Sequence, residues 1–129
     1  VDDVRPDTVM TFGPDGITGH PDHRTMSAWV DLALARSTER PRLLHAVGRE
    51  VVLDQELDED FGVYELGRPR VVPDDELDLL LALDGDALDR KVEALLRQSS
   101  QTGGLVAAAG LERFSAWVAT ESFALPATR

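Results

Sequence analysis

The chain contains no cysteine among its 129 residues. A disulfide framework and a thiolate metal cage are both excluded, and a reducing compartment fits this composition, so we expect a cytoplasmic protein. Basic residues are also scarce: 13 Lys and Arg against 24 Asp and Glu give a net charge of −11. Because phosphate binding requires clustered Lys and Arg, this charge argues against nucleic acids and anionic membrane surfaces as partners.

Long apolar runs are absent as well. None approaches the ~20 residues that span a bilayer. The acidic start, Val1-Asp2-Asp3-Val4, lacks the basic and then apolar pattern of a signal peptide, and the first residue is not Met. We therefore expect that the native protein extends upstream or pairs with a separate N-terminal piece. The 43% of apolar residues suits one globular domain over residues 1–129.

Short β-rich runs alternate with helical patterns along the chain. The patterns predict a helix that begins after an N-cap at Asp22, a break at Gly103-Gly104, and a helix interruption at Gly110. This alternation favours an α/β fold with a mostly parallel sheet. The almost wholly apolar run 77–83 predicts a strand covered on both faces. The predicted strands are residues 8–12, 42–47, 77–83 and 121–125, and the later predicted helices are residues 87–98 and 105–118.

Two of the three histidines, His20 and His23, lie three residues apart around Asp22. They belong to a glycine-rich loop, residues 13–21, that leaves a predicted strand and enters a helix. Ligand sites in parallel α/β sheets lie beyond the carboxyl ends of strands, and a neutral imidazole is a good zinc donor. Taken alone, the pattern also suits two loop histidines beside a simple N-cap, because a catalytic zinc requires three protein ligands.

The run VMTFGPDGITGHPDH, residues 9–23, resembles the second signature of the PIG-L / LmbE-like de-N-acetylase family. This resemblance implies a Rossmann-like three-layer α/β/α fold, of which the chain is the C-terminal portion. It also implies zinc-dependent hydrolysis of an N-acetyl group from an N-acetylglucosamine-type amino sugar or glycoconjugate. The likeness continues at residues 88–91, 94–95, 100–101, 114, 117 and 121–123.

The resemblance assigns a role to each residue of the loop. His23 is the expected metal ligand, and His20 the expected electrophile or general acid toward the oxyanion. Asp22 is expected to orient and charge His20, and Thr18 to contact substrate. The family's first signature, an AHPDDE-like run, is absent, so the other ligands of one zinc ion and the general base must come from an N-terminal half. The chain alone is expected to be inactive. Gln98 stands where many bacterial members have His.

Two other functions stay open at this point. One is a non-catalytic relative that binds a sugar or a partner chain, with a homo-oligomer also possible; the other is a metal hydrolase acting on a phosphoester. An HPDDE-like run upstream of Val1 favours the deacetylase. His45 is interpreted as a satisfied core histidine, and Trp29 and Trp117 as core residues. The acidic clusters 54–60 and 74–78 lack the spacing of a calcium loop and are interpreted as solvated surface.

Overall fold

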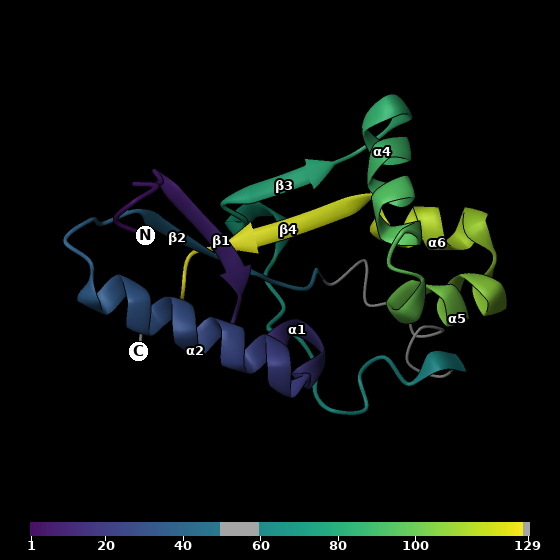
Figure 1. Ribbon diagram of the computed structural model, residues 1–129. Helices are drawn as coiled ribbons and strands as arrows, with labels where there is room; N and C mark the ends of the chain where they lie inside the picture. Colours follow the sequence, from purple (N-terminus) through teal and green to yellow (C-terminus); the bar gives the residue numbers. More distant parts are fainter. Residues whose placement is uncertain (50–59, 128–129) are drawn as a thin grey trace. The chain divides into compact units, whose positions relative to one another are not determined.

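Figure 1 shows the computed structural model of the chain, which describes residues 1–49 and 60–127. The chain divides into two compact units, one formed by Val1–Leu79 with Ser122–Arg129 and the other by Leu80–Glu121. The acidic cluster predicted at 54–60 lies outside the described residues except for Asp60. Each unit is described by itself below.

The four strands form one sheet in the order β1-β2-β4-β3. β1 and β2 are parallel, with Phe12 opposite Ala46, whereas β2 and β4 are antiparallel, with His45 opposite Ala124. The α/β class is therefore confirmed. The mostly parallel three-layer arrangement is not, because β4 returns antiparallel to β2 and makes the sheet mixed. The strands are β1 (Thr8–Phe12), β2 (Arg42–Ala46), β3 (Leu79–Ala82) and β4 (Thr120–Ala124).

The helix α2 (Pro21–Arg36) packs on β1 and is the longest element of the first unit. Pro21 occupies its first turn, where the missing N–H costs no hydrogen bond. The predicted N-cap at Asp22 is wrong by two positions. His20 is the N-cap, and its ring accepts the Asp22 N–H, because Asp22 already lies inside the helix. At the other end, the Ser37 N–H donates to the carbonyls of Ala33 and Leu34.

Several large apolar residues of α2 are exposed. Met26 is 44% exposed, Trp29 64% and Leu32 48%, whereas Ser27 is the buried residue of this helix. The prediction that Trp29 belongs to the core is therefore wrong. Helical periodicity identifies a stripe of apolar residues, but it does not show what covers that stripe.

The core of the first unit lies beyond the carboxyl end of β2. Val47, Val72 and Ala124 are buried there, and Leu77 packs against them. The acidic segment 74–78, which contains the 3-10 helix η1 (Asp74–Glu76), is tied to basic side chains. Arg49 pairs with Asp74, and Arg42 donates to Asp78 at 2.5 Å. These contacts agree with a structural surface role for the predicted cluster 74–78.

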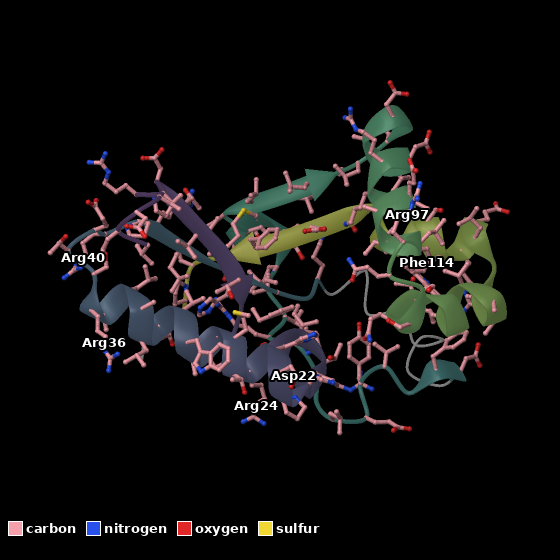
Figure 2. All side chains as sticks on the ribbon, in the orientation of Figure 1. Asp22, Arg24, Arg36, Arg40, Arg97 and Phe114 are labelled. Carbon is pink, nitrogen blue, oxygen red and sulfur yellow. The ribbon has the colours of Figure 1, made fainter. Side chains whose placement is uncertain are left out.

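The second unit consists mainly of three mutually packed helices, α4 (Gly85–Leu96), α5 (Ser99–Ala109) and α6 (Leu111–Val118). Their buried side chains include Phe114, which is labelled in Figure 2, and Val92. Gly110, with φ +83°, separates α5 from α6 as predicted. The predicted break at Gly103-Gly104 is wrong because both residues lie within α5. Each glycine costs a helix only about 1 kcal/mol relative to Ala, which tertiary packing can offset.

Two further predictions concern apolar residues of β3 and α6. β3 is not covered on both faces, since Leu80 is 42% and Leu81 36% exposed. Trp117 is partly buried in α6, and the Arg113 guanidinium lies 5.0 Å from its ring centroid.

None of the helices described within residues 1–49 and 60–127 has the length and apolar character required to cross a bilayer.

Candidate active site

The His20–His23 segment lies just beyond the carboxyl end of β1, between that strand and α2. A short turn, α1 (Gly16–Gly19), precedes it. The Asp15 carboxylate caps this turn by accepting the Ile17 N–H at 2.9 Å. Ile17 has a backbone φ of +64°, a positive value that residues other than Gly, Asn and Asp rarely adopt. The turn that presents the two histidines is therefore held in an uncommon conformation.

Gly19 lies at a close crossing of two backbone segments. Its φ is +75°, and a Cβ built there would meet the Leu66 carbonyl oxygen at 2.1 Å and the Gly67 nitrogen at 2.6 Å. Gly67 faces Gly19 in return, since a Cβ on Gly67 would lie 3.1 Å from the Gly19 Cα. Only glycine fits at position 19 without moving the 66–67 backbone.

His23 is held by its own turn. Its Nδ1 lies 3.0 Å from the Gly16 carbonyl oxygen, and its ring stacks on Phe12 with centroids 4.0 Å apart and an interplanar angle of 4°. A carbonyl oxygen can only accept, so Nδ1 is the donor of this hydrogen bond. In the neutral ring the lone pair is then on Nε2, which is the arrangement seen in histidines that bind metals.

His20 lies beside His23 and is more exposed. The two ring centroids are 5.1 Å apart, and the His20 side chain is 48% exposed. Its Nδ1 accepts the Asp22 N–H at 3.2 Å, and the Asp22 carboxylate lies 3.9 Å from the same nitrogen. Because Nδ1 accepts in this state, the proton of the neutral ring is on Nε2, which is free to act as a donor.

The two other predicted site residues are Asp22 and Thr18. Asp22 lies at the N-terminal end of α2, as Figure 2 shows, and its side chain is 90% exposed. Thr18 is partly buried within α1. The loop therefore brings His20, Asp22 and His23 together, with Thr18 two residues away. Gln98 belongs to the second unit, where it precedes α5 without capping it by a side-chain hydrogen bond.

The described residues do not assemble a complete metal site. Within residues 1–49 and 60–127, no group of three His, Cys, Asp or Glu side chains could hold a metal ion. The orientation of His23 suits a single ligand, whereas a catalytic zinc needs three protein ligands. Any metal bound here would need further ligands from outside the described residues.

The third histidine has surroundings that the sequence did not indicate. His45 on β2 is only 6% exposed, and within the described part of the chain its Nε2 is buried without a hydrogen-bond partner. Burial lowers the pKa of this imidazole, the charges of Asp31 and Asp15 act in the opposite direction, and Arg70 lowers it further. His45 is thus a core histidine as predicted, but the prediction that it is satisfied is wrong. Its surroundings come from segments far apart in sequence, so no local pattern could have revealed them.

Comparison with known proteins gives two relatives of one type. The chain is 33% identical over 103 residues to a protein of Corynebacterium diphtheriae named 1D-myo-inositol 2-acetamido-2-deoxy-alpha-D-glucopyranoside deacetylase. It is also 33% identical over 102 residues to the protein of the same name from Corynebacterium efficiens. Both matches cover 76% of this chain but only 34% and 33% of the relatives, so the matched part spans about a third of their length. No family model matches the chain.

Proposed function

We propose that this chain is part of a zinc-dependent de-N-acetylase of the PIG-L / LmbE-like family. The complete protein would hydrolyse the N-acetyl group of an N-acetylglucosamine-type amino sugar or glycoconjugate, giving acetate and a free amine. The observation that carries the proposal is the paired arrangement of His20 and His23 at the end of β1. The similarity to two proteins named as deacetylases of an acetamido sugar supports the same reaction class.

His23 is the proposed metal ligand of this chain. The hydrogen bond from Nδ1 to the Gly16 carbonyl directs the Nε2 lone pair away from the turn, and the stack on Phe12 fixes the plane of the ring. A carbonyl that accepts from the other ring nitrogen also raises the basicity of the coordinating nitrogen. A zinc ion bound here would lower the pKa of a water molecule and polarise the acetyl carbonyl.

His20 and Asp22 are proposed to handle charge and protons on the substrate. With Nδ1 accepting from the Asp22 N–H, the Nε2–H of His20 can donate to the oxyanion that forms when water adds to the acetyl carbon. A protonated His20 has no lone pair at Nδ1, so the Asp22 carboxylate, 3.9 Å away, becomes the natural partner of that nitrogen. An imidazolium that solvent has protonated at Nδ1 before the reaction can then give its Nε2 proton to the amine nitrogen as the C–N bond breaks, which leaves a neutral ring protonated at Nδ1. Thr18 is proposed to contact the substrate beside this pair.

The remaining ligands and the general base are proposed to come from an N-terminal half of the protein. The exposed surfaces of the first unit support this completion. Among the strands of the described residues, β1 lies at the edge of the sheet; Met10 on it is 44% exposed, and Trp29 and Met26 are exposed on α2. An unpaired edge next to apolar side chains is a surface that proteins usually cover.

The roles of the histidines can be separated by metal content and kinetics of the complete protein. His23→Ala is expected to lose zinc and activity together. His20→Ala is expected to keep its zinc and lose roughly 100- to 1000-fold in kcat on an N-acetylglucosaminide, because an oxyanion donor acts only in the transition state. His45→Gln is the matched histidine control and is expected to keep its zinc. Full zinc occupancy in His23→Ala would exclude the ligand role, and loss of zinc in His20→Ala would exclude the assignment of His20.

A further inference from the structure

A cavity of the first unit lies beside His45, and neither His20 nor His23 lines it. Its volume is about 240 Å³, and it is formed by the loop after β1, by α2, by the end of β2 and by the segment after β4. The polar side chains that line it are Asp15, Asp31, His45 and Arg70. All of them belong to the same compact unit.

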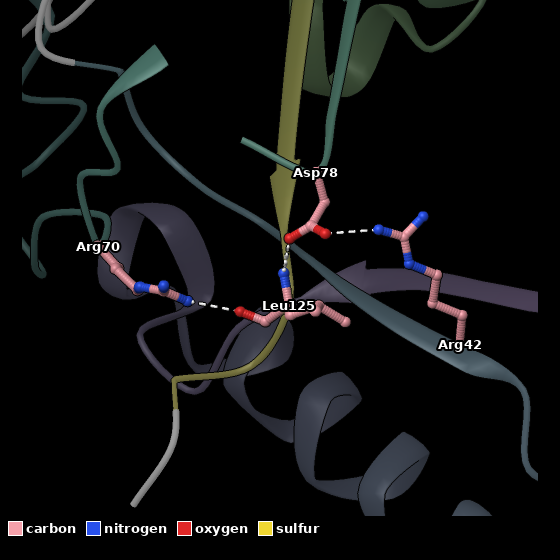
Figure 3. Close-up of polar contacts among 4 residues, drawn as sticks. All are labelled: Arg42, Arg70, Asp78 and Leu125. Carbon is pink, nitrogen blue, oxygen red and sulfur yellow. Dashed lines mark hydrogen bonds and ion pairs between the residues drawn. The ribbon is translucent and has the colours of Figure 1, made fainter. Parts of the chain in front are cut away.

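The walls of this cavity are fixed by polar contacts. Figure 3 shows the segment after β4 tied at Leu125, whose N–H donates to Asp78 at 2.7 Å and whose carbonyl accepts from Arg70 at 2.8 Å. Asp78 in turn accepts from Arg42. The Asp15 carboxylate, which also lines the cavity, accepts the backbone N–H of Arg70 at 2.6 Å. The cavity is therefore a built feature of the unit.

Two polar groups at the cavity are left without partners. His45 is 94% buried, being 6% exposed, and its Nε2 has no hydrogen-bond partner within the described residues. Asp31 is exposed and forms no ion pair or hydrogen bond within residues 1–49 and 60–127, although its charge acts on His45. A buried polar atom without a partner costs about 1–3 kcal/mol, so a group that supplies the missing hydrogen bond is favoured.

Glycine at position 13 keeps space open next to the imidazole. A Cβ on Gly13 would lie 3.6 Å from both the Cβ and the Nδ1 of His45 and 3.3 Å from the Asp15 carboxylate. The backbone of Gly13 does not have a positive φ, so its conformation does not require glycine. The absence of a side chain instead leaves room where the loop, His45 and Asp15 meet.

We propose that this cavity binds a small primary ammonium ligand, with Asp31 as its charge partner, His45 as a neutral acceptor and the apolar walls around its hydrocarbon part. The two carboxylates and one guanidinium leave a charge of −1 at the cavity, which disfavours an anion. The guanidinium of Arg70 is also engaged with the Leu125 carbonyl. No three-ligand metal group exists among the described residues, which disfavours a divalent ion. The other lining residues are small and not aromatic, which disfavours a sugar ring.

The proposal is independent of the deacetylase reaction and is tested with the complete protein. The probe is n-butylammonium chloride, compared at equal ionic strength with sodium butyrate and with 1-butanol. Binding is followed by calorimetry and by the ring C–H resonances of His45. The ammonium is expected to bind and to shift these resonances, whereas the other two compounds are not. Equal binding of butyrate or butanol, or no binding of the ammonium, overturns the proposal.

Three variants connect binding with the named residues. Asp31→Asn removes the charge but keeps the shape and is expected to weaken ammonium binding roughly 3- to 10-fold, as for a partly exposed charged hydrogen bond. Gly13→Ala keeps every charge, narrows the space at His45, and is expected to weaken binding as well. Asp75→Asn removes an exposed carboxylate of the same unit that does not line the cavity, and it is expected to leave binding unchanged. Unchanged affinity in Asp31→Asn, or an equal loss in Asp75→Asn, refutes the site.

Discussion

A substitution at Gly19, which directly precedes the His20–His23 segment, tests the backbone crossing with residues 66–67. The perturbation is a single methyl group, Gly19→Ala. Two costs add at this position. The backbone has φ +75°, which costs a residue with a side chain roughly 1–2 kcal/mol. The new Cβ would also lie 2.1 Å from the Leu66 carbonyl oxygen, whereas ordinary van der Waals contact begins at 3.4 Å.

The second cost is the larger one because the obstacle is backbone. The segment at Leu66 and Gly67 would have to retreat by more than 1 Å, the difference between 3.4 and 2.1 Å. Overpacking that forces backbone shifts costs about 1–3 kcal/mol. Together the two terms predict that Gly19→Ala lowers the free energy of unfolding by about 2–5 kcal/mol. Because His20 follows directly, we also expect the variant to lose activity.

Gly62→Ala is the matched control for the conformational term. Gly62 belongs to the same unit and has φ +60°, but its Cβ would meet only the far end of the exposed Glu65 side chain, which can move aside. It is expected to cost about 1–2 kcal/mol, the conformational term alone. The assay is urea unfolding of the complete protein, followed by circular dichroism, together with turnover of an N-acetylglucosaminide. If both variants lose the same free energy of unfolding to within 0.5 kcal/mol or so, the steric argument at Gly19 is wrong.

Two other consequences can be measured. His45 has a folded-state pKa below its ordinary value of 6.5, so near this pH the folded protein binds fewer protons than the unfolded one. The free energy of unfolding should therefore fall as the pH decreases from 6.5 toward the folded-state pKa, by at most about 1.4 kcal/mol per pH unit. Urea unfolding at several pH values should show this dependence in the parent protein and not in His45→Gln. Trp29, which is 64% exposed, should emit at long wavelength and be readily quenched by acrylamide in the isolated chain, and should become protected in the complete protein; equal quenching in both would contradict the proposal that an N-terminal half covers α2.

The sequence predicted the elements that local patterns control. All four strands lie within two residues of their predicted positions, and the interruption at Gly110 is confirmed, because β-rich runs and a left-handed glycine act over a few residues. The histidine loop between β1 and α2 was also predicted, since glycine and proline mark it regardless of context. The roles of Thr18, His20, Asp22 and His23 stay predictions.

Tertiary structure decided what local patterns cannot specify. Met26 and Trp29 on α2, and Leu80 and Leu81 of the run 77–83, are exposed instead of covered, because burial depends on which segments pack against an element. The antiparallel pairing of β4 with β2, the backbone crossing at Gly19, and the unpartnered Nε2 of His45 each join segments that are distant in sequence. Side-chain type and spacing thus determined the elements and the identity of the candidate site. Long-range packing determined which groups share a cavity, because contacts between distant segments produce no periodic pattern of residues in the sequence.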